Sequence, residues 1–181
     1  SGIKNVIIGA EDPNPLVSGS GIKNLISHGV VVQTGVCAEL VQEQNKFFFF
    51  KNNNKRPYIT IKIASSKDGK SHLLDGNRTF ITSKESRKDV QELRAIHDAI
   101  LTGGNTVVND APRMNARVNF PLNQPKKILL SNKTNFDLSA KFFKDCNYEI
   151  LNETDIHKIL EKFSKTNITS ILVEAGPKLV N

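Results

Sequence analysis

The stretch Asp98-Ala-Ile-Leu-Thr-Gly-Gly-Asn-Thr106 joins an apolar run directly to a pair of glycines and a polar helix start. The apolar run predicts a buried strand over residues 98–102, because strands covered on both faces of a parallel sheet show continuous apolar residues. The glycines allow the chain to turn into a short helix that reaches Asp110 and is ended by Pro112. Ligands of open parallel sheets bind beyond such carboxyl ends of strands.

Three further apolar runs predict the other strands of the same sheet, at residues 58–64, 127–131 and 170–174. The first of them alternates strictly and places Ile59, Ile61 and Ile63 on one face. Lys62 lies on the opposite face. A lysine inside such a strand indicates an edge position, contact with solvent or a place beside a binding site.

Helices are expected between these strands. Thr82 and Glu85 have the spacing of a capping box, which predicts a helix from there to about His97. The residues that this helix is expected to bury are Val90, Leu93 and Ile96. A second helix is predicted at residues 156–165, before the last strand. Alternating strands and helices indicate an α/β sheet that is covered on both faces.

The first fifty residues show the same alternation on a smaller scale, with strands at residues 5–9 and 30–32 and helices at residues 21–28 and 38–50. A strand, a helix and a strand in this order imply a parallel pair with a right-handed crossover. Six polar residues then precede Pro57, which is typical of a linker. The sequence thus predicts a small α/β unit at residues 1–50, a linker at residues 51–57 and a second domain at residues 58–181.

The charge is unevenly distributed. The chain carries a net charge of +7, of which residues 1–50 contribute −1 and residues 51–181 contribute +8. A basic half suits an anionic partner, either a nucleic acid or a phosphorylated small molecule, while a solvated lysine-rich surface has the same composition. Aromatic residues make up 7% of the chain and Trp is absent, which leaves little material for stacking bases. We therefore expect no nucleic-acid partner.

The two cysteines, Cys37 and Cys146, are far apart in the sequence, and neither a Cys-x-x-Cys nor a His-x-Glu motif occurs. This pattern argues against a zinc site and favours two reduced thiols of the core in a cytosolic protein over a single long-range disulfide. A run of eighteen apolar residues and a signal peptide are both missing from the sequence. We expect a cytoplasmic protein without a membrane segment and without a metal of its own.

Two strand ends carry glycine and lead into helix starts, at Gly103-Gly-Asn-Thr106 and at Ala175-Gly-Pro177. Glycine lets a phosphate approach the backbone, and a helix N-terminus offers free N–H groups. Either stretch alone reads as an ordinary turn, but two on one sheet favour a nucleotide ligand. The polar residues expected near these ends are Lys62, Asp110, Arg117 and Glu174, of which Glu174 also fits a helix-capping or surface position. Arg94 is expected on the helix beside Leu93, where a solvated arginine is the alternative.

Together these motifs resemble a known family. The stretches that carry the resemblance are Gly9-Ala-Glu-Asp-Pro-Asn-Pro15, Gly19-Ser-Gly21, Pro57-Tyr-Ile-Thr-Ile-Lys-Ile-Ala64, Asp68-Gly69, Phe80-Ile-Thr82, Leu93-Arg94, Asp98-Ala-Ile-Leu101, Thr106-x-x-x-Asp110-x-Pro112, Arg117 and Val173-Glu-Ala-Gly-Pro177. Over residues 3–181 their order and spacing resemble the bifunctional deaminase-reductases of riboflavin biosynthesis.

The resemblance implies a fold and an activity. Residues 1–50 would be the C-terminal tail of a cytidine-deaminase-like α/β/α domain, and the rest a dihydrofolate-reductase-like α/β domain that continues beyond Asn181 in the family. The reductase would use NADPH to convert the ribosyl side chain of 5-amino-6-(5-phosphoribosylamino)uracil to the ribityl form. The zinc of the family's deaminase is held by a histidine and two cysteines whose motifs do not occur here, so zinc belongs to the deaminase domain of the parent protein only. We also expect a homo-oligomer.

The resemblance also assigns site residues, position by position. Candidates for orientation and proton handling are Lys62, Asp110 and Glu174. Expected cofactor contacts are Ala64, Phe80, Thr106, Asp110, Asn132, Gly176, Pro177, Lys178 and Leu179. Expected contacts to the phosphoribosylated aminopyrimidine are Arg78, Arg94, Met114, Arg117 and Glu174, the arginines being suited to bidentate phosphate binding. Two rival hypotheses are a non-catalytic basic module that binds nucleotides or nucleic acid, and an inactive structural fragment.

Overall fold

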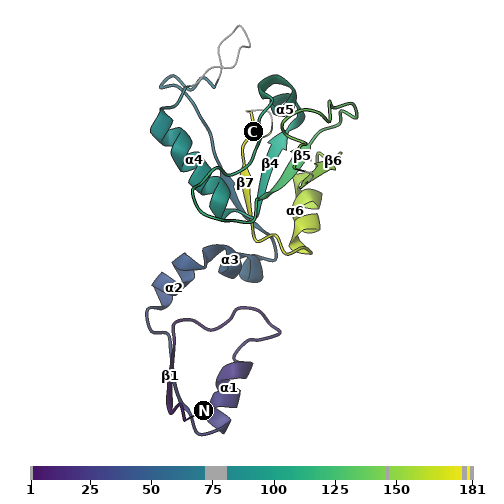
Figure 1. Cartoon of the computed structure of the whole chain (residues 1–181). Helices are drawn as coiled ribbons and strands as arrows, with labels where there is room; N and C mark the ends of the chain where they lie inside the picture. The colour runs from purple at the N-terminus through teal and green to yellow at the C-terminus, as the bar shows by residue number, and fades with distance from the viewer. Residues whose placement is uncertain (1, 72–80, 146, 177–178, 180–181) are drawn as a thin grey trace. The chain divides into compact units, whose positions relative to one another are not determined.

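The computed structural model describes residues 2–71, 81–145, 147–176 and 179. The chain divides into two compact units, Ser1–Arg56 and Pro57–Asn181 (Figure 1). The predicted helix start after Ala175 falls largely outside the described residues, as do Cys146 and the expected site residues Arg78, Phe80, Pro177 and Lys178.

The first unit is built around two short parallel strands. β1 (Asn5–Ile8) pairs with β2 (Val31–Thr34), and Asn5 lies opposite Val31. Helix α1 (Ser20–Ser27) connects them and is entered through Gly19, whose φ of 70° suits glycine. The predicted strand–helix–strand unit is therefore confirmed.

The single helix predicted at residues 38–50 is instead two helices, α2 (Ala38–Gln44) and α3 (Lys46–Asn54), separated at Asn45. The amide of Asn45 donates to the carbonyl of Val41 at 2.9 Å, an alternative bond that Asn side chains offer at helix ends. Asn52 and Asn54 make the same side-chain bond to the carbonyls four residues earlier. Since α3 extends to Asn54, much of the polar stretch expected as a linker is helical. Cys37, expected in the core, is exposed and has a φ of 57° before α2.

The second unit contains a five-stranded parallel sheet with the strand order β3-β7-β4-β5-β6. The strands are β3 (Tyr58–Ile61), β4 (Ala99–Gly103), β5 (Lys126–Leu130), β6 (Tyr148–Leu151) and β7 (Ser170–Val173). β7, the last strand in the sequence, lies between β3 and β4, so β7 and β4 are both interior strands of the sheet (Figure 1). The expected parallel α/β sheet is confirmed, while β6 was not predicted.

Successive residues of the central strands feed two apolar clusters on opposite faces of the sheet. One cluster contains Leu101, Ile128 and Val173 and is covered by Ile159 and Phe163 of α6 (Ile156–Ser164). The other contains Ile100, Leu129 and Leu172 and packs against Phe142, Phe143 and Val107 of α5 (Gly104–Asp110). Because both faces are covered, these strands lack alternation.

β3 lies at an edge of the sheet. Ile59 packs against the first apolar cluster, but Ile61 is 51% and Ile63 63% exposed. The alternation in this strand therefore continues beyond the part that the core covers. Of the alternatives left open for Lys62, the edge position is observed for the strand that it follows.

α4 (Lys84–Ile96) packs Leu93 against the second apolar cluster as predicted but differs from its prediction in its cap and at Ile96. Ser83, not Thr82, is the N-cap, because the Ser83 hydroxyl accepts the backbone N–H of Ser86 at 3.2 Å. Ile96 is 56% exposed, whereas Arg94 is buried. Arg94 can occupy a buried position because the carboxylate of Glu174, directly after β7, is its ion-pair partner.

Candidate functional site

The carboxyl end of β7 places a carboxylate inside the second unit. Glu174 directly follows the strand and is 8% exposed. Its backbone N–H donates to the carbonyl of Leu101 at 2.9 Å, so the chain still runs alongside β4 at this point. The side chain is thereby fixed at the edge of the sheet where strand ends and glycine turns meet, as predicted.

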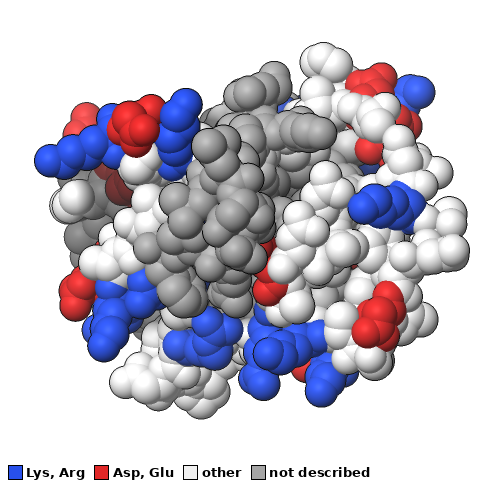
Figure 2. All heavy atoms as spheres, turned by 90° about the horizontal axis from the view of Figure 1, so that it is seen from above, with Lys and Arg blue, Asp and Glu red and all other residues white. Residues whose placement is uncertain are grey.

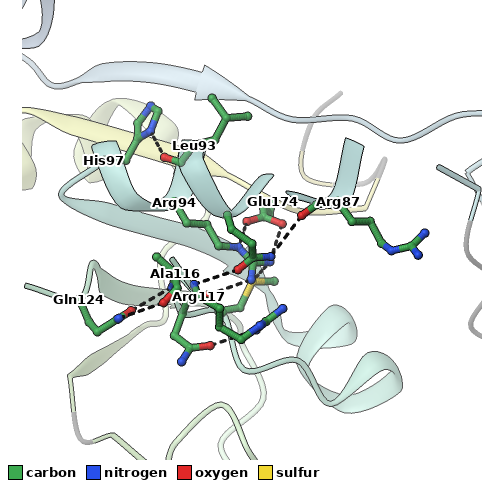
Figure 3. Close-up of polar contacts among 11 residues, drawn as sticks. Arg87, Leu93, Arg94, His97, Ala116, Arg117, Gln124 and Glu174 are labelled. Atoms are coloured by element: carbon green, nitrogen blue, oxygen red, sulfur yellow. Dashed lines mark hydrogen bonds and ion pairs between the residues drawn. The ribbon is translucent and has the colours of Figure 1, made fainter. Parts of the chain in front are cut away.

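Glu174 is paired with Arg94 of α4 (Figure 3). The Nε of Arg94 donates to Oε1 at 2.5 Å and its Nη2 donates to Oε2 at 2.8 Å, which is the bidentate geometry of a strong charge-assisted pair. Both side chains are about nine-tenths buried. The structure thus brings together two residues expected as separate substrate contacts and binds them to each other.

Arg94 also holds the turn that follows α5 (Gly104–Asp110). Its Nη1 donates to the carbonyl of Asn115 at 3.2 Å, and its Nη2 lies 3.7 Å from the sulfur of Met114. A guanidinium has five N–H groups, and the contacts to described residues use four of them. Arg94 therefore serves mainly as a tie between α4, β7 and this turn.

Arg117 lies in the same turn and is exposed. Its Nη1 donates to the side-chain oxygen of Asn115 at 3.2 Å. Partial burial lowers the pKa of Arg117, and the positive charges of Arg94 and Arg113 lower it further, while Glu174 opposes the shift. An arginine stays protonated at neutral pH all the same, so Arg117 presents a positive charge that binding of an anion would stabilise.

A groove of about 570 Å³ opens beside Arg117, between α4 and residues 117–120. Its walls combine cationic, amide and apolar side chains. The lining residues are Lys88, Gln91, Glu92, Ala95, Ile96, Arg117, Val118, Asn119 and Phe120. Arg117 connects this groove to the network around Arg94, and Gln91, which also lines the groove, is hydrogen-bonded to Arg117.

The glycines at the two strand ends, Gly104 and Gly176, have different surroundings. A Cβ at Gly104 would lie 2.4 Å from the hydroxyl oxygen of Ser131, so internal packing by itself requires glycine there. A Cβ at Gly176 would meet nothing within 4 Å among the described residues. Leu179 donates its N–H to the carbonyl of Gly176 at 3.1 Å, and its side chain reaches to 4.0 Å from a Cβ built on Gly103. The two predicted strand ends therefore do lie together.

The other expected site residues lie around these strand ends. Lys62 donates its backbone N–H to Val173 at 3.0 Å and is half-buried, as are Ala64, Thr106 and Asp110, whereas Asn132 is exposed. Among the described residues, neither the Lys62 nor the Asp110 side chain is hydrogen-bonded or ion-paired to Arg94 or Glu174. Within the same residues, the buried hydroxyl of Thr102 has no partner.

Sequence reasoning missed Asn115, which lies in the turn that carries Arg117 and contacts its guanidinium. It also missed Gln91 and Gln124, which bond to the backbone of this turn. Their partners are largely backbone groups, which leave no pattern in the sequence. Across the described ranges, no group of three or more His, Cys, Asp or Glu side chains could hold a metal ion. No described helix is both long and apolar enough to cross a membrane.

Comparison with known proteins identifies the family. Residues 57–181 match the model of the RibD C-terminal domain. The riboflavin biosynthesis protein RibD of Aquifex aeolicus is 37% identical over 98% of this chain and 56% of its own length. The chain thus spans about half the length of this relative.

Solved structures agree with this match. The chain superposes on RibD of Acinetobacter baumannii with a TM-score of 0.89 and 32% identity, covering 97% of this chain and 56% of that one. A Thermotoga maritima protein described as a diaminohydroxyphosphoribosylaminopyrimidine deaminase/5-amino-6-(5-phosphoribosylamino)uracil reductase gives a TM-score of 0.82 at 32% identity, over 98% of this chain and 55% of that one. The chain belongs to the RibD family, and its residues 57–181 belong to the RibD C-terminal domain.

Proposed function

We propose that this chain carries the reductase part of a riboflavin-biosynthesis protein, which reduces the ribosyl side chain of 5-amino-6-(5-phosphoribosylamino)uracil to the ribityl form with NADPH. The observation that carries the proposal is the placement of Arg117 beside the buried Arg94–Glu174 pair, at the carboxyl edge of a parallel sheet in a RibD C-terminal domain. In proteins with open parallel sheets, ligands bind beyond the carboxyl ends of the strands.

On the substrate side, Arg117 would bind the phosphate ester, because its guanidinium is cationic and has few protein partners. Arg94 would offer its remaining N–H and hold Met114 and Asn115 in place. Arg78 is proposed as a further contact from its position in the sequence alone. Since both oxygens of Glu174 accept hydrogen bonds from Arg94, Glu174 would orient this arginine rather than deliver a proton. Proton handling then falls to Lys62 or Asp110.

On the cofactor side, the space at Gly176 fits a phosphate group, since no described residue lies within 4 Å of the position that a Cβ would take. Residues 176–179 would hold the cofactor's phosphates, while Thr106, Asp110, Asn132 and Ala64 would contact it from the neighbouring strand ends. Phe80 is a further candidate from the sequence. When bound, NADPH supplies the hydride that reduces the first ribose carbon. This chain's own contribution is to place two phosphorylated molecules against each other.

Other parts of the proposal concern the complete protein. Residues 1–50 are proposed as the tail of a deaminase domain, whose zinc would be held outside this chain. A cytoplasmic location and a homo-oligomeric state stay predictions. The rival hypothesis of a basic nucleic-acid module rests on net charge. On the face shown in Figure 2, however, Lys and Arg side chains form separate groups with acidic side chains among them, unlike a continuous basic stripe.

A calorimetric titration of the complete protein with NADPH tests this proposal, with Gly176→Val as the variant. A valine fits the fold at this exposed position but fills the space proposed for a phosphate, so we expect NADPH binding in the parent and at least a tenfold weaker binding in the variant. Binding of the uracil substrate is the internal control and should be retained. A folded Gly176→Val protein that binds NADPH like the parent would show that the cofactor lies elsewhere.

A further inference from the structure

The turn that carries Arg117 has an unusual backbone. Ala111 and Met114 have φ values of 42° and 51°, which place two residues with side chains in the left-handed region. Each such residue costs free energy and persists only where its surroundings fix it. The turn at residues 111–117 therefore depends on contacts made from outside it.

Arg94 makes such contacts at Met114 and Asn115, and two glutamine side chains make them at Ala116 and Arg117. Gln124 accepts the N–H of Ala116 at 2.9 Å and donates to the carbonyl of the same residue at 3.0 Å, which clamps the residue before Arg117 (Figure 3). Gln91, one turn before Arg94 on α4, accepts the backbone N–H of Arg117 at 3.1 Å. The backbone on both sides of the Ala116–Arg117 peptide bond is thus held by side-chain amides.

We propose that Gln91 and Gln124 are positioning residues that hold Arg117 ready for a phosphate ester. The role in catalysis rests on the proposed function, since it concerns the same phosphate-bearing substrate. Because the guanidinium starts from a fixed backbone, less conformational entropy is lost when the anion binds.

The chemical type of these side chains supports the proposal. Both are neutral amides, and so is Asn115, which contacts the guanidinium of Arg117 itself. A carboxylate in any of these places would pair with Arg117 and compete with the anion. Two acids face this region. Glu174 is bound at both oxygens by Arg94, and Glu92, which lines the groove beside Arg117, forms no ion pair with Arg117 among the described residues. The turn is therefore fixed without neutralising the charge of Arg117.

A purely structural role predicts a different behaviour. If the glutamines only stabilise the unit, their loss lowers the stability and affects all ligands alike. If they position Arg117, their loss weakens phosphate binding, and this effect disappears once Arg117 itself has been removed. A double-mutant cycle separates the two cases.

The experiment uses the complete protein with the variants Gln124→Met and Gln91→Met, each alone and combined with Arg117→Ala. Methionine keeps the length of the side chain but removes the amide. Gln44→Met, at the exposed end of α2, is the matched control. Binding of inorganic phosphate is measured by calorimetry, and the KM values for the uracil substrate and for NADPH are measured beside it.

We expect Gln124→Met to weaken phosphate binding and to raise the KM for the uracil substrate about fivefold to tenfold, since two hydrogen bonds are lost. Gln91→Met, which removes one bond to this turn, should have a smaller effect of about threefold. The KM for NADPH should stay within about twofold of the parent, as should every constant of the control. In the Arg117→Ala background, neither substitution should weaken phosphate binding further.

A loss of equal size in the Arg117→Ala background would overturn the proposal, and so would unchanged phosphate binding in the folded Gln124→Met protein. Where Gln124→Met does not fold, Gln91→Met carries the same test. The phosphate titration also separates this proposal from the proposed function. A protein that binds phosphate through Arg117 but does not reduce the uracil substrate would contradict the function and leave the positioning role supported.

Discussion

Arg94 and Lys127 are both buried cations of the second unit, but they are paired in different ways. Arg94 is bound at two atoms by a carboxylate that is as deeply buried as itself. The Lys127 side chain is only 2% exposed, and its ammonium donates to the carbonyl of Phe142 at 2.7 Å, whereas its acidic partner Asp145 is 52% exposed. One cation is neutralised inside the protein, and the other is held chiefly by the backbone.

Their positions on the sheet explain the difference. Lys127 is the second residue of β5 and lies near the amino end of the sheet, where it ties the segment that contains Phe142 to the core. Glu174 follows the last residue of β7 at the carboxyl end, where ligands of such sheets bind. We infer that the pair with Glu174 serves the site as well as the fold, while Lys127 serves the fold alone.

The largest effect is expected from Glu174→Gln, which leaves the buried charge of Arg94 without a counter-charge. Breaking a buried pair in this way costs about 3–5 kcal/mol of stability. Urea unfolding of the complete protein measures it. Arg94→Met combined with Glu174→Leu should be less destabilising than Glu174→Gln, because no unpaired charge is left behind. A loss below about 1 kcal/mol in Glu174→Gln would mean that water reaches the pair.

Arg117→Ala should act on binding and leave stability nearly unchanged. Losing a charge-assisted contact to a phosphate costs about 1.5–3 kcal/mol, so the KM for the uracil substrate should rise by more than tenfold. The KM for NADPH is the control and should change far less. Equal changes in both constants would remove Arg117 from the phosphate site.

Lys127→Met should behave in the opposite way. The carbonyl of Phe142 loses its buried donor, which costs about 1–3 kcal/mol of stability. Neither KM should change. Asp145→Asn is the matched control, and its cost should stay below about 1 kcal/mol because the carboxylate is half exposed. A raised KM for the uracil substrate in Lys127→Met would contradict the division between a pair for the site and a cation for the fold.

The smallest effect is expected at Glu149 of β6, which accepts hydrogen bonds from Lys126 and Lys162. Burial raises the pKa of Glu149, but the two lysines outweigh burial and hold its pKa below the ordinary value of 4.5. Its contribution to stability is therefore present above pH 4.5 and is lost as the pH falls through the lower value of the folded state. Because the two lysines are partly exposed, this contribution amounts to about 0.2–1 kcal/mol. Glu149→Gln should abolish this part of the pH dependence of unfolding.

The sequence predicted most of the sheet because its central strands are continuous apolar runs that end in turns. β6 was missed because Tyr148–Leu151 is short and contains Glu149, which is stabilised by lysines from other elements. The break at Asn45 depends on which hydrogen bond an asparagine side chain forms, and the sequence does not specify it.

The site was predictable in its location but not in its connections. Arg117 and Glu174 were expected at one edge, since strand ends of a parallel sheet meet there, whereas Arg94 was expected at the site from the family resemblance. The pairing of Arg94 with Glu174 requires knowledge of how far α4 is rotated about its axis. The apolar pattern of α4 predicted the packing of Leu93 but placed the exposed Ile96 in the buried face. The roles of Gln91 and Gln124 arise from bonds to backbone groups, which any sequence offers at every position.

The most direct test of the central claim measures substrate-dependent oxidation of NADPH by the complete protein, with Arg117→Ala and Lys127→Met compared under conditions where both are folded. Our account predicts that the parent oxidises NADPH only when 5-amino-6-(5-phosphoribosylamino)uracil is present. It also predicts that Arg117→Ala raises the KM for this substrate by more than tenfold, whereas Lys127→Met stays within about twofold of the parent. A folded parent without this activity, or equal KM values in the two variants, would contradict the claim that the carboxyl edge of this sheet is the reductase site.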